Sequence, residues 1–494
     1  MKKIFNLKQT SVKVYVALLS VCWFVTSVQA QTGYTLQQAV DYAVKNNVSV
    51  KNASLDVTNA KYRINEVKSV GLPQINGTVQ LQHNIKIQQS ILDGRAGSNP
   101  FLNSGGASEP GFYEKDIYTR LNVNDIPTPA PAQPADPNAV FSFAFGLKNN
   151  AILSVTASQL LFSSSYLVGL QAARVYREVT QKSLTNSKIN ITELVSKAYY
   201  GVLVNQERLD LLKANVERLE KLLNETREFN KNGFVEKLDV DRLEVQFNNL
   251  KVEAEKVARL VDLSYDLLKF QMGMNISEKI TLADKLGDLS NATFTPIKTD
   301  SINYTNRIEY SLLESQKSLN ILDVKNLRSG RIPSLGMSAT YGYNPAATRL
   351  QDIFESSRWL NFFYVGFQLN VPIFDGLGTY NKVQQKKIEL LKTENSMSQF
   401  RQTIDLQISQ ANITLENALE SLKTQKRNLD LAEEIIRVTR IKYQQGVGSN
   451  IEVINAEASL KEAQTNYFGS LYDALVAKVD LDKSSGALGS NNVK

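Results

Sequence analysis

The sequence holds few residues that could carry out chemistry. His83 is the only histidine and Cys22 the only cysteine among 494 residues. A catalytic triad based on histidine, or a zinc site of several cysteine and histidine ligands, needs more than this. No glycine-rich phosphate loop occurs either. We therefore expect no enzyme, no metal site and no cofactor, although catalysis by carboxylates alone stays open.

Cys22 lies in a segment typical of a secretory signal peptide. An apolar core from Val14 to Val25 is followed by the small-residue pattern Val28-Gln29-Ala30. This order predicts cleavage after Ala30, within a signal peptide of residues 1–30. The alternative is a signal anchor, but a helix that crosses a bilayer takes about 20 apolar residues. Val21 precedes Cys22 where lipid-acceptor signals have a small residue, so whether Cys22 is ever lipidated stays open.

Cleavage would also change the charge of the chain. The whole sequence has 56 lysines and arginines against 49 acidic residues, a net charge of +7. Four of the lysines lie in residues 1–30 and no acidic residue does, so 52 minus 49 leaves +3. More than half of the net positive charge thus lies in the predicted signal peptide, and we expect no nucleic-acid partner. The rest of the chain has no run of 18 apolar residues, which leaves periplasmic, secreted and outer-membrane β-barrel proteins.

The chain reads as two copies of one plan. When Asn46 is set against Asn306 and the copies are read on without gaps, Pro73 meets Pro333. We therefore predict a first repeat over 31–300 and a second over 301–494. The first has a β-hairpin at about 74–160 with a long proline-rich loop at 88–147, whose role stays open, and long helices over 163–273. The second has a β-hairpin at about 334–373 and long helices over 378–485.

Apolar residues at 3–4 spacing mark the long helices. No proline interrupts residues 166–229, a length too great for a globular helix and typical of a coiled coil or tunnel wall. The predicted seams for neighbouring helices are Leu209, Leu212, Val216, Leu219, Leu223 and Thr226, with Leu415, Ala418, Leu422, Gln425, Leu429, Ala432 and Ile436; after each turn follow Leu243, Phe247, Leu250, Ala254, Val257 and Val261, with Ala456, Leu460, Ala463, Tyr467, Ser470 and Ala474.

The segments between the helices alternate in polarity. Residues 78–82, 153–158, 335–343 and 363–371 each place apolar and polar side chains in turn. Such strands are typical of an outer-membrane barrel with one lipid face, and also of a soluble β-sandwich. Four strands alone close no barrel, so the barrel interpretation requires several chains.

The duplicated helix-strand-strand-helix order, the run from Val371 to Gly376 and two glycine turns resemble the TolC-like outer membrane efflux proteins. The resemblance covers essentially the whole exported chain. It implies a mainly α protein with membrane β structure: a homotrimer in which a 12-stranded β-barrel joins a long α-helical coiled-coil tunnel. The implied function is a passive exit duct of the outer membrane, in a tripartite efflux or type I secretion system. Its partners would be outer-membrane lipid, a periplasmic adaptor and an inner-membrane pump, with cargo, adaptor and pump unidentified. An exported coiled-coil structural or adhesive protein without a pore is the alternative.

The resemblance also implies where adaptors dock and where the channel closes. The docking turns map onto Gly233, Phe234 and Val235 and onto Gly446, Val447 and Gly448, although these could be helix breaks alone. The family's latching arginine would fall at Gly448, so whether a latch exists is open. Glu452 could form a ring of charge or be an ordinary acid at a helix start, and Asn455 replaces a second acidic ring. The periplasmic gate maps onto Asp239, Tyr443, Glu452 and Asn455.

Overall fold

The computed structural model describes residues 33–93, 140–144, 146–286 and 303–490. The predicted signal peptide and the middle of the predicted loop 88–147 lie outside these ranges. The chain divides into two units. One comprises the described residues of 1–68, 164–332 and 372–494 and is helical; the other comprises those of 69–163 and 333–371 and holds the strands.

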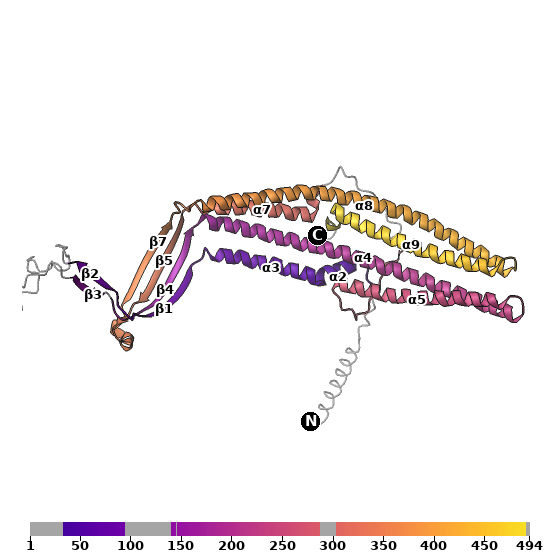
Figure 1. Cartoon of the computed structure of the whole chain (residues 1–494), viewed down its shortest axis with the longest axis horizontal. Coiled ribbons are helices and arrows are strands. Elements are labelled where there is room, and N and C mark those ends of the chain that lie inside the picture. The colour runs from indigo at the N-terminus through magenta and orange to yellow at the C-terminus, as the bar shows by residue number, and fades with distance from the viewer. Residues whose placement is uncertain (1–32, 94–139, 145, 287–302, 491–494) are drawn as a thin grey trace, which may run out of the picture. The chain divides into compact units, whose positions relative to one another are not determined.

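Two helical hairpins dominate the helical unit (Figure 1). The first pairs α4 (Ser164–Lys231) with α5 (Lys237–Met272), and the second pairs α8 (Gly378–Gln444) with α9 (Asn450–Ser485). α4 and α8 have 68 and 67 residues, about 100 Å each at 1.5 Å per residue. These four helices lie within the ranges 163–273 and 378–485 that the sequence analysis expects to be helical.

One apolar cluster joins all four hairpin helices. It is built from residues three and four apart, so each helix turns the same stripe toward its neighbours. All of the predicted seam residues are buried or half-buried, which confirms the seams. The buried members are Leu209, Leu212, Leu219, Leu222 and Leu223 of α4, Val240, Leu243, Leu250, Val257 and Val261 of α5, Leu429, Ala432 and Ile436 of α8, and Val453, Ala456, Leu460 and Ala463 of α9.

Shorter helices extend the two hairpins, and each hairpin meets them at one joint. α5 ends at Gly273, with φ of 70°, against the break between α2 (Leu36–Asn46) and α3 (Val48–Ser69). A Cβ on Gly273 would lie 2.8 Å from the Cα of Asn47, so only glycine fits there. The side-chain amide of Asn47 donates to the carbonyl of Gln271, 2.8 Å away. We call this contact the first joint.

The second joint has the same form. α9 ends at Gly486, with φ of 81°, and a Cβ there would lie 2.7 Å from the carbonyl oxygen of Asn306. Arg307 then starts α7 (Ile308–Ser329), and its guanidinium donates to the Ser484 carbonyl at 2.7 Å. Short elements complete the unit: η4 (Tyr304–Asn306) and α10 (Ala487–Ser490).

The strand unit is an antiparallel sheet in the order β1-β4-β5-β7. Its strands are β1 (Gln74–His83), β4 (Asn149–Phe162), β5 (Ser334–Tyr343) and β7 (Asn361–Asn370). The strand register places the apolar side chains of neighbouring strands next to one another. Val79 pairs with Leu153 and Leu153 with Tyr343. Tyr341, two residues before Tyr343 and so on the same face, pairs with Phe363. One face of the sheet is therefore apolar and the other mostly polar.

Two further strands occupy the ends of the predicted loop 88–147. β2 (Gln89–Asp93) and β3 (Val140–Ala144) form an antiparallel pair, where the sequence prediction had only loop. Both segments contain strand-forming residues, but the many prolines between them hid this pairing. The second connection holds β6 (Ala346–Ala347), η5 (Leu350–Phe354) and η6 (Ser356–Arg358). Its β6 pairs with β4.

Candidate functional site

Both hairpins turn through the same backbone motif. The N–H of Phe234 donates to the Phe229 carbonyl and that of Gly233 to the Asn230 carbonyl, at 2.9 Å each. The N–H of Val447 likewise donates to Lys442 and that of Gly446 to Tyr443, at 3.0 Å each. This is the Schellman motif, which needs a left-handed residue after the helix. Gly233 and Gly446 supply it, with φ of 79° and 77°. We call residues 232–236 and 445–449 the hairpin tips.

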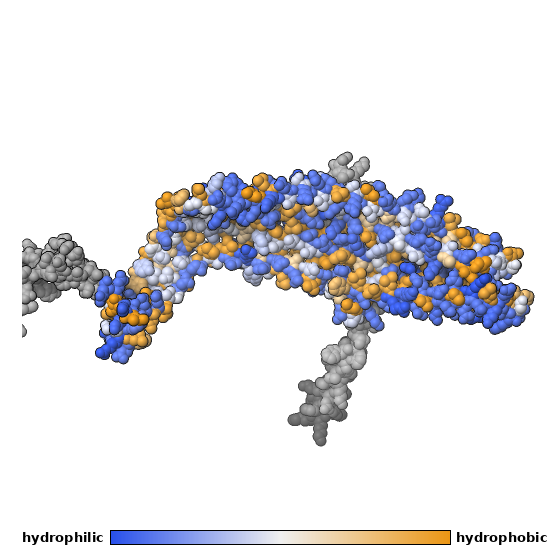
Figure 2. All heavy atoms as spheres, viewed as in Figure 1, coloured by the Kyte–Doolittle hydropathy of each residue, from blue (hydrophilic) through white to orange (hydrophobic). Residues whose placement is uncertain are grey.

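Each tip presents one large apolar side chain to solvent. Phe234 is 78% exposed and Val447 is 79% exposed, although each directly follows the glycine of its turn. Val235 and Gly448 are half-buried. Figure 2 shows hydrophobic residues among hydrophilic ones along the visible face of the helices, including near the tips. The two turns thus place an exposed apolar residue at the same position.

Gly448 is a glycine for a reason other than backbone angle. A Cβ at this position would lie 3.0 Å from the Cβ of Lys442 and 3.1 Å from the Tyr443 nitrogen. A side chain here would therefore require the end of α8 to shift slightly. Gly448, where the resemblance would place the latching arginine, thus lies close against the end of α8.

Asp239 contacts the second hairpin through a residue that the sequence did not indicate. The side-chain amide of Asn450 donates to the Asp239 carbonyl oxygen at 2.9 Å and lies 3.2 Å from Asp239 Oδ1. Asn450 is the first residue of α9 and only 4% exposed. This contact ties the start of α5 to the start of α9. Its only sequence signal is an asparagine directly after the capping residue Ser449.

The other predicted gate residues lie apart from this contact. The hydroxyl of Tyr443 lies 3.4 Å from that of Thr226, which connects the ends of α8 and α4. Glu452 and Asn455 are exposed in the first turns of α9. The N–H of Glu452 donates to the capping Ser449 hydroxyl at 3.4 Å. Glu452 thus also has the local role expected of an acid at a helix start.

Two further buried polar residues that the sequence did not indicate lie in the seam between α4 and α9, farther from the tips. Glu457 is buried, and burial raises its pKa despite the nearby Arg218 and Arg440. About two turns farther along α9, the Asn215 side chain of α4 donates to Gln464 at 2.7 Å. Both acceptors belong to a second buried stripe on α9 that also includes Val453, Leu460 and Phe468. The sequence pattern predicts a single buried stripe on α9, and Glu457 and Gln464 lie outside it.

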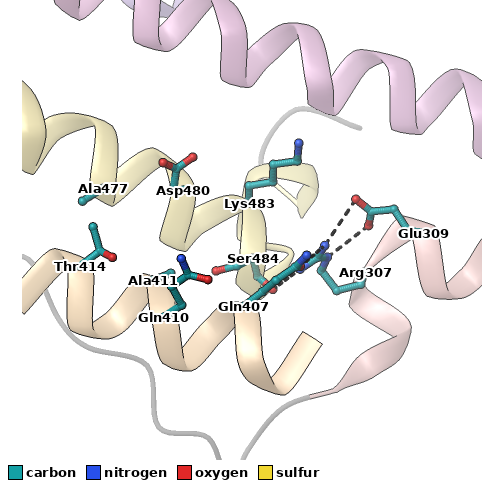
Figure 3. Close-up of a pocket in the computed structure, with 10 residues that line it drawn as sticks. All are labelled: Arg307, Glu309, Gln407, Gln410, Ala411, Thr414, Ala477, Asp480, Lys483 and Ser484. Carbon is teal, nitrogen blue, oxygen red and sulfur yellow. Dashed lines mark hydrogen bonds and ion pairs between the residues drawn. The ribbon is translucent and has the colours of Figure 1, made fainter. Parts of the chain in front are cut away.

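Charged groups also hold the joints. At the second joint the Arg307 guanidinium donates to Glu309 and Gln407 at 3.1 Å each (Figure 3). These side chains line a pocket of about 460 Å³ between α8 and α9. On the opposite side of α9, Glu193 accepts from Lys197 at 2.8 Å and from Lys483 at 2.6 Å. Burial raises the pKa of Glu193, but the two lysines lower it more, and the net shift is downward.

The structure gives His83 a structural partner. Its Nδ1 lies 2.6 Å from Asn149 Oδ1, while the amide nitrogen of Asn149 donates to the Thr348 carbonyl at 3.0 Å. Across the described ranges, no three histidine, cysteine or acidic residues are placed to hold a metal ion. Within those ranges, no helix combines the length and apolar character that a bilayer crossing needs.

Known proteins share both sequence and fold with this chain. The family model described as "Outer membrane efflux protein" matches residues 322–487. The outer membrane protein TolC of Vibrio cholerae is 21% identical over 342 residues, which cover 69% of this chain and 77% of that protein. The chain is thus similar to the TolC-like outer membrane efflux proteins. Its location is the outer membrane, from which it extends into the periplasm.

Further matches support this relationship. The alkaline protease secretion protein AprF of Pseudomonas aeruginosa is 23% identical and covers 60% of this chain and 61% of its own length. The solved structure of CusC has a TM-score of 0.66 at 15% identity and covers 92% of each chain. The outer membrane channel CmeC of Campylobacter jejuni has a TM-score of 0.65, also at 15% identity, over 91% of this chain and 85% of that one. The TolC-like fold is thus shared over nearly the whole chain.

Proposed function

We propose that this protein is a passive exit channel of the outer membrane, formed by three copies of the chain. The observation that carries the proposal is the sheet with one apolar face. Large apolar residues on that face remain exposed in the single chain, with Val79 at 81% and Phe367 at 68% exposure. Facing lipid would remove this surface from water, whereas a soluble protein would have to leave it exposed. The exposed members of the face are Ile75, Val79, Leu81, Leu153, Val155, Tyr341, Phe363, Val365, Phe367 and Leu369.

The edges of the sheet support a barrel shared between copies. In the described sheet, β1 and β7 are the outer strands, and each has a free backbone edge. A backbone edge within lipid must find hydrogen-bonding partners, because the hydrocarbon offers none. Pairing β1 of one copy with β7 of the next would satisfy both edges. Three four-stranded sheets joined in this way give the 12-stranded barrel that the resemblance implies.

The similar joints and tips support a duplicated architecture. Each joint places a left-handed glycine against an asparagine backbone, and each tip has the same Schellman turn. We propose that residues 31–300 and 301–494 are structural repeats, as the sequence predicts. Two equivalent hairpins per chain would give six around the axis of a trimer, enough for a tunnel wall.

The tips are the proposed docking surface for a periplasmic adaptor, which links the channel to an inner-membrane pump in an efflux or type I secretion system. Phe234 and Val447 would be the contact residues, since both are exposed and neither packs into its own turn. Docking would open the periplasmic end by separating the two hairpins, and cargo would pass without being transformed.

Planar-bilayer recordings of the detergent-purified protein, together with its mass, test the channel. We expect a trimer that needs detergent for extraction and shows long-lived, cation-preferring openings. A protein that is soluble without detergent and conducts no current would refute the channel and favour a coiled-coil structural or adhesive protein.

Docking is tested separately with the double variant Phe234→Asp, Val447→Asp. We expect export in cells to stop, while trimers still reach the outer membrane and still conduct in bilayers. Leu55→Asp, at 65% exposure on α3, is the control for a charge placed on an exposed apolar position away from the tips. Normal export by the double variant would reject the tips as the docking surface.

A further inference from the structure

Glu457 is an unusual residue for the middle of a helical seam. It is 7% exposed, and its Oε1 has no hydrogen-bond donor among the described residues. It lies on α9 between Val453 and Leu460, which are fully buried in the cluster that joins the hairpins. A buried carboxylate without donors is costly, whereas a protonated carboxyl in the same place is much less so.

The neighbouring pocket contains a second buried acceptor. Asn215 of α4 is 2% exposed, and its Oδ1 likewise has no donor among the described residues, while its amide nitrogen donates to Gln464. Asn215 and Glu457 line one pocket of about 460 Å³ between α4, α5 and α9. Neither oxygen receives a hydrogen bond from the described residues, and a protonated Glu457 carboxyl has a donor that the carboxylate lacks.

The surrounding cations do not replace this proton. Arg440 of α8 donates to the backbone carbonyl of Arg218 at 2.9 Å, so it is directed toward α4 instead of Glu457. The Nε of Arg218 is buried and has no acceptor among the described residues. Lys256 of α5 and Lys461 of α9 line the same pocket. Both arginines act on Glu457 electrostatically, yet burial outweighs them and its pKa stays raised.

We propose that Glu457 makes the packing of the two helical hairpins depend on a proton. The α4–α5 and α8–α9 hairpins pack together when the Glu457 carboxyl is protonated, and they separate more readily once it is ionised. The link to channel opening rests on the proposed function, whereas the proton dependence of packing rests on the contacts of α4 and α9 alone.

The direction of the pH effect follows from linkage. The packed state binds the Glu457 proton more tightly than a separated, hydrated state does. Packing is therefore unaffected below the ordinary glutamate pKa of 4.5, and it weakens as the pH rises from there to the raised pKa of the packed state. One proton per chain changes the ratio of packed to separated hairpins by at most about tenfold per pH unit in that window. Above the window the ratio is constant.

Distances between the tips test the inference directly. Cys22 is the only native cysteine, so Cys22→Ala with Asn232→Cys and Gln445→Cys places one spin label on each exposed tip. Labelled chains are assembled with an excess of unlabelled chains, and the distance within one chain is measured by pulsed electron paramagnetic resonance from pH 4 to pH 8. We expect the longer distance to gain population as the pH rises, with a slope of one proton per chain.

Two variants assign the effect. Glu457→Gln keeps the shape of the side chain without its charge, so we expect the short distance throughout the pH range. Glu462→Gln removes an exposed acid from the same helix and should keep the titration of the parent. The inference is overturned if the parent shows no pH dependence, or if Glu457→Gln titrates as the parent does.

Bilayer recordings on the same samples separate this inference from the proposed function. A pH-dependent distance in a trimer that never conducts would reject the channel and retain the proton-linked packing. A trimer that conducts, but whose tip-to-tip distance does not change with pH, would reject the proton-linked packing and retain the channel.

Discussion

Replacing Asn450 with alanine should loosen the contact between the two hairpins at their tips. The Asn450 amide makes one hydrogen bond to the Asp239 carbonyl and a second, 3.2 Å long, to its carboxylate. A neutral hydrogen bond contributes about 0.5 to 1.5 kcal/mol and one to a charged group about 1.5 to 3 kcal/mol. The Asp239 side chain is 27% exposed, which favours the lower part of the second range. Asn450→Ala should therefore remove about 2 to 3 kcal/mol from the packed state.

This loss converts into a measurable change in gating. A free-energy change of about 2 to 3 kcal/mol alters an equilibrium by about 30- to 150-fold. If separation of the tips opens the channel, the ratio of open to closed time in single-channel recordings should rise by this factor per chain. Asp239→Asn removes the charge but keeps the backbone carbonyl that accepts the first bond, so its effect should be the smaller of the two.

A matched control is available on the same helix. Asn466 is exposed on α9, and Asn466→Ala should leave the open-to-closed ratio unchanged. The reasoning is refuted if Asn450→Ala forms trimers and gates like the parent, or if Asp239→Asn has the larger effect.

Three further outcomes are expected. Gly233→Ala and Gly446→Ala should each cost about 1 to 2 kcal/mol through the left-handed backbone alone, seen as faster hydrogen exchange at the tips; Gly469→Ala, in open space within α9, should instead stabilise the helix by about 0.5 to 1 kcal/mol, and equal effects would contradict this. Glu452→Ala should reduce the cation preference measured by reversal potential, because three carboxylates around an axis focus the field; unchanged selectivity would exclude a charge ring. Glu193→Gln should lower the free energy of unfolding by about 2 to 3 kcal/mol at neutral pH; since its pKa is lowered in the folded state, that stabilisation is present above the ordinary value of 4.5 and is lost as the pH falls through the lowered pKa, so a difference that persists in strong acid would contradict the assignment.

The long helices and their turns were predictable because their signals are local. Stripes such as Leu209, Leu212 and Leu219 repeat over many turns, and a glycine after such a stripe indicates its end. All six predicted seam residues of α9 are buried or half-buried, and the four main strands follow from their alternating polarity.

The contacts between hairpins could not be predicted in the same way. Whether Asp239 meets Asn450, or Glu457 becomes buried, depends on which faces of α4, α5 and α9 come together, and these segments lie about 200 residues apart in the chain. A glutamate in a polar helix looks like a solvent-facing residue until a second buried stripe is known. The strand pair β2–β3 was missed for a related reason, since its partners lie on either side of a long proline-rich segment.

The two joints have a mechanical consequence. At each joint the shorter helices meet end to end. The uninterrupted α4 packs alongside the first joint and the uninterrupted α8 alongside the second. A bending force is thus borne by a continuous helix wherever its neighbours are interrupted. Adding one residue to α5 or α9 would rotate everything beyond it by about 100° and shift it by about 1.5 Å. Gly273 and Gly486 would then miss their asparagine partners, so the hairpins should tolerate length changes only in matched pairs of helices, or at the tips.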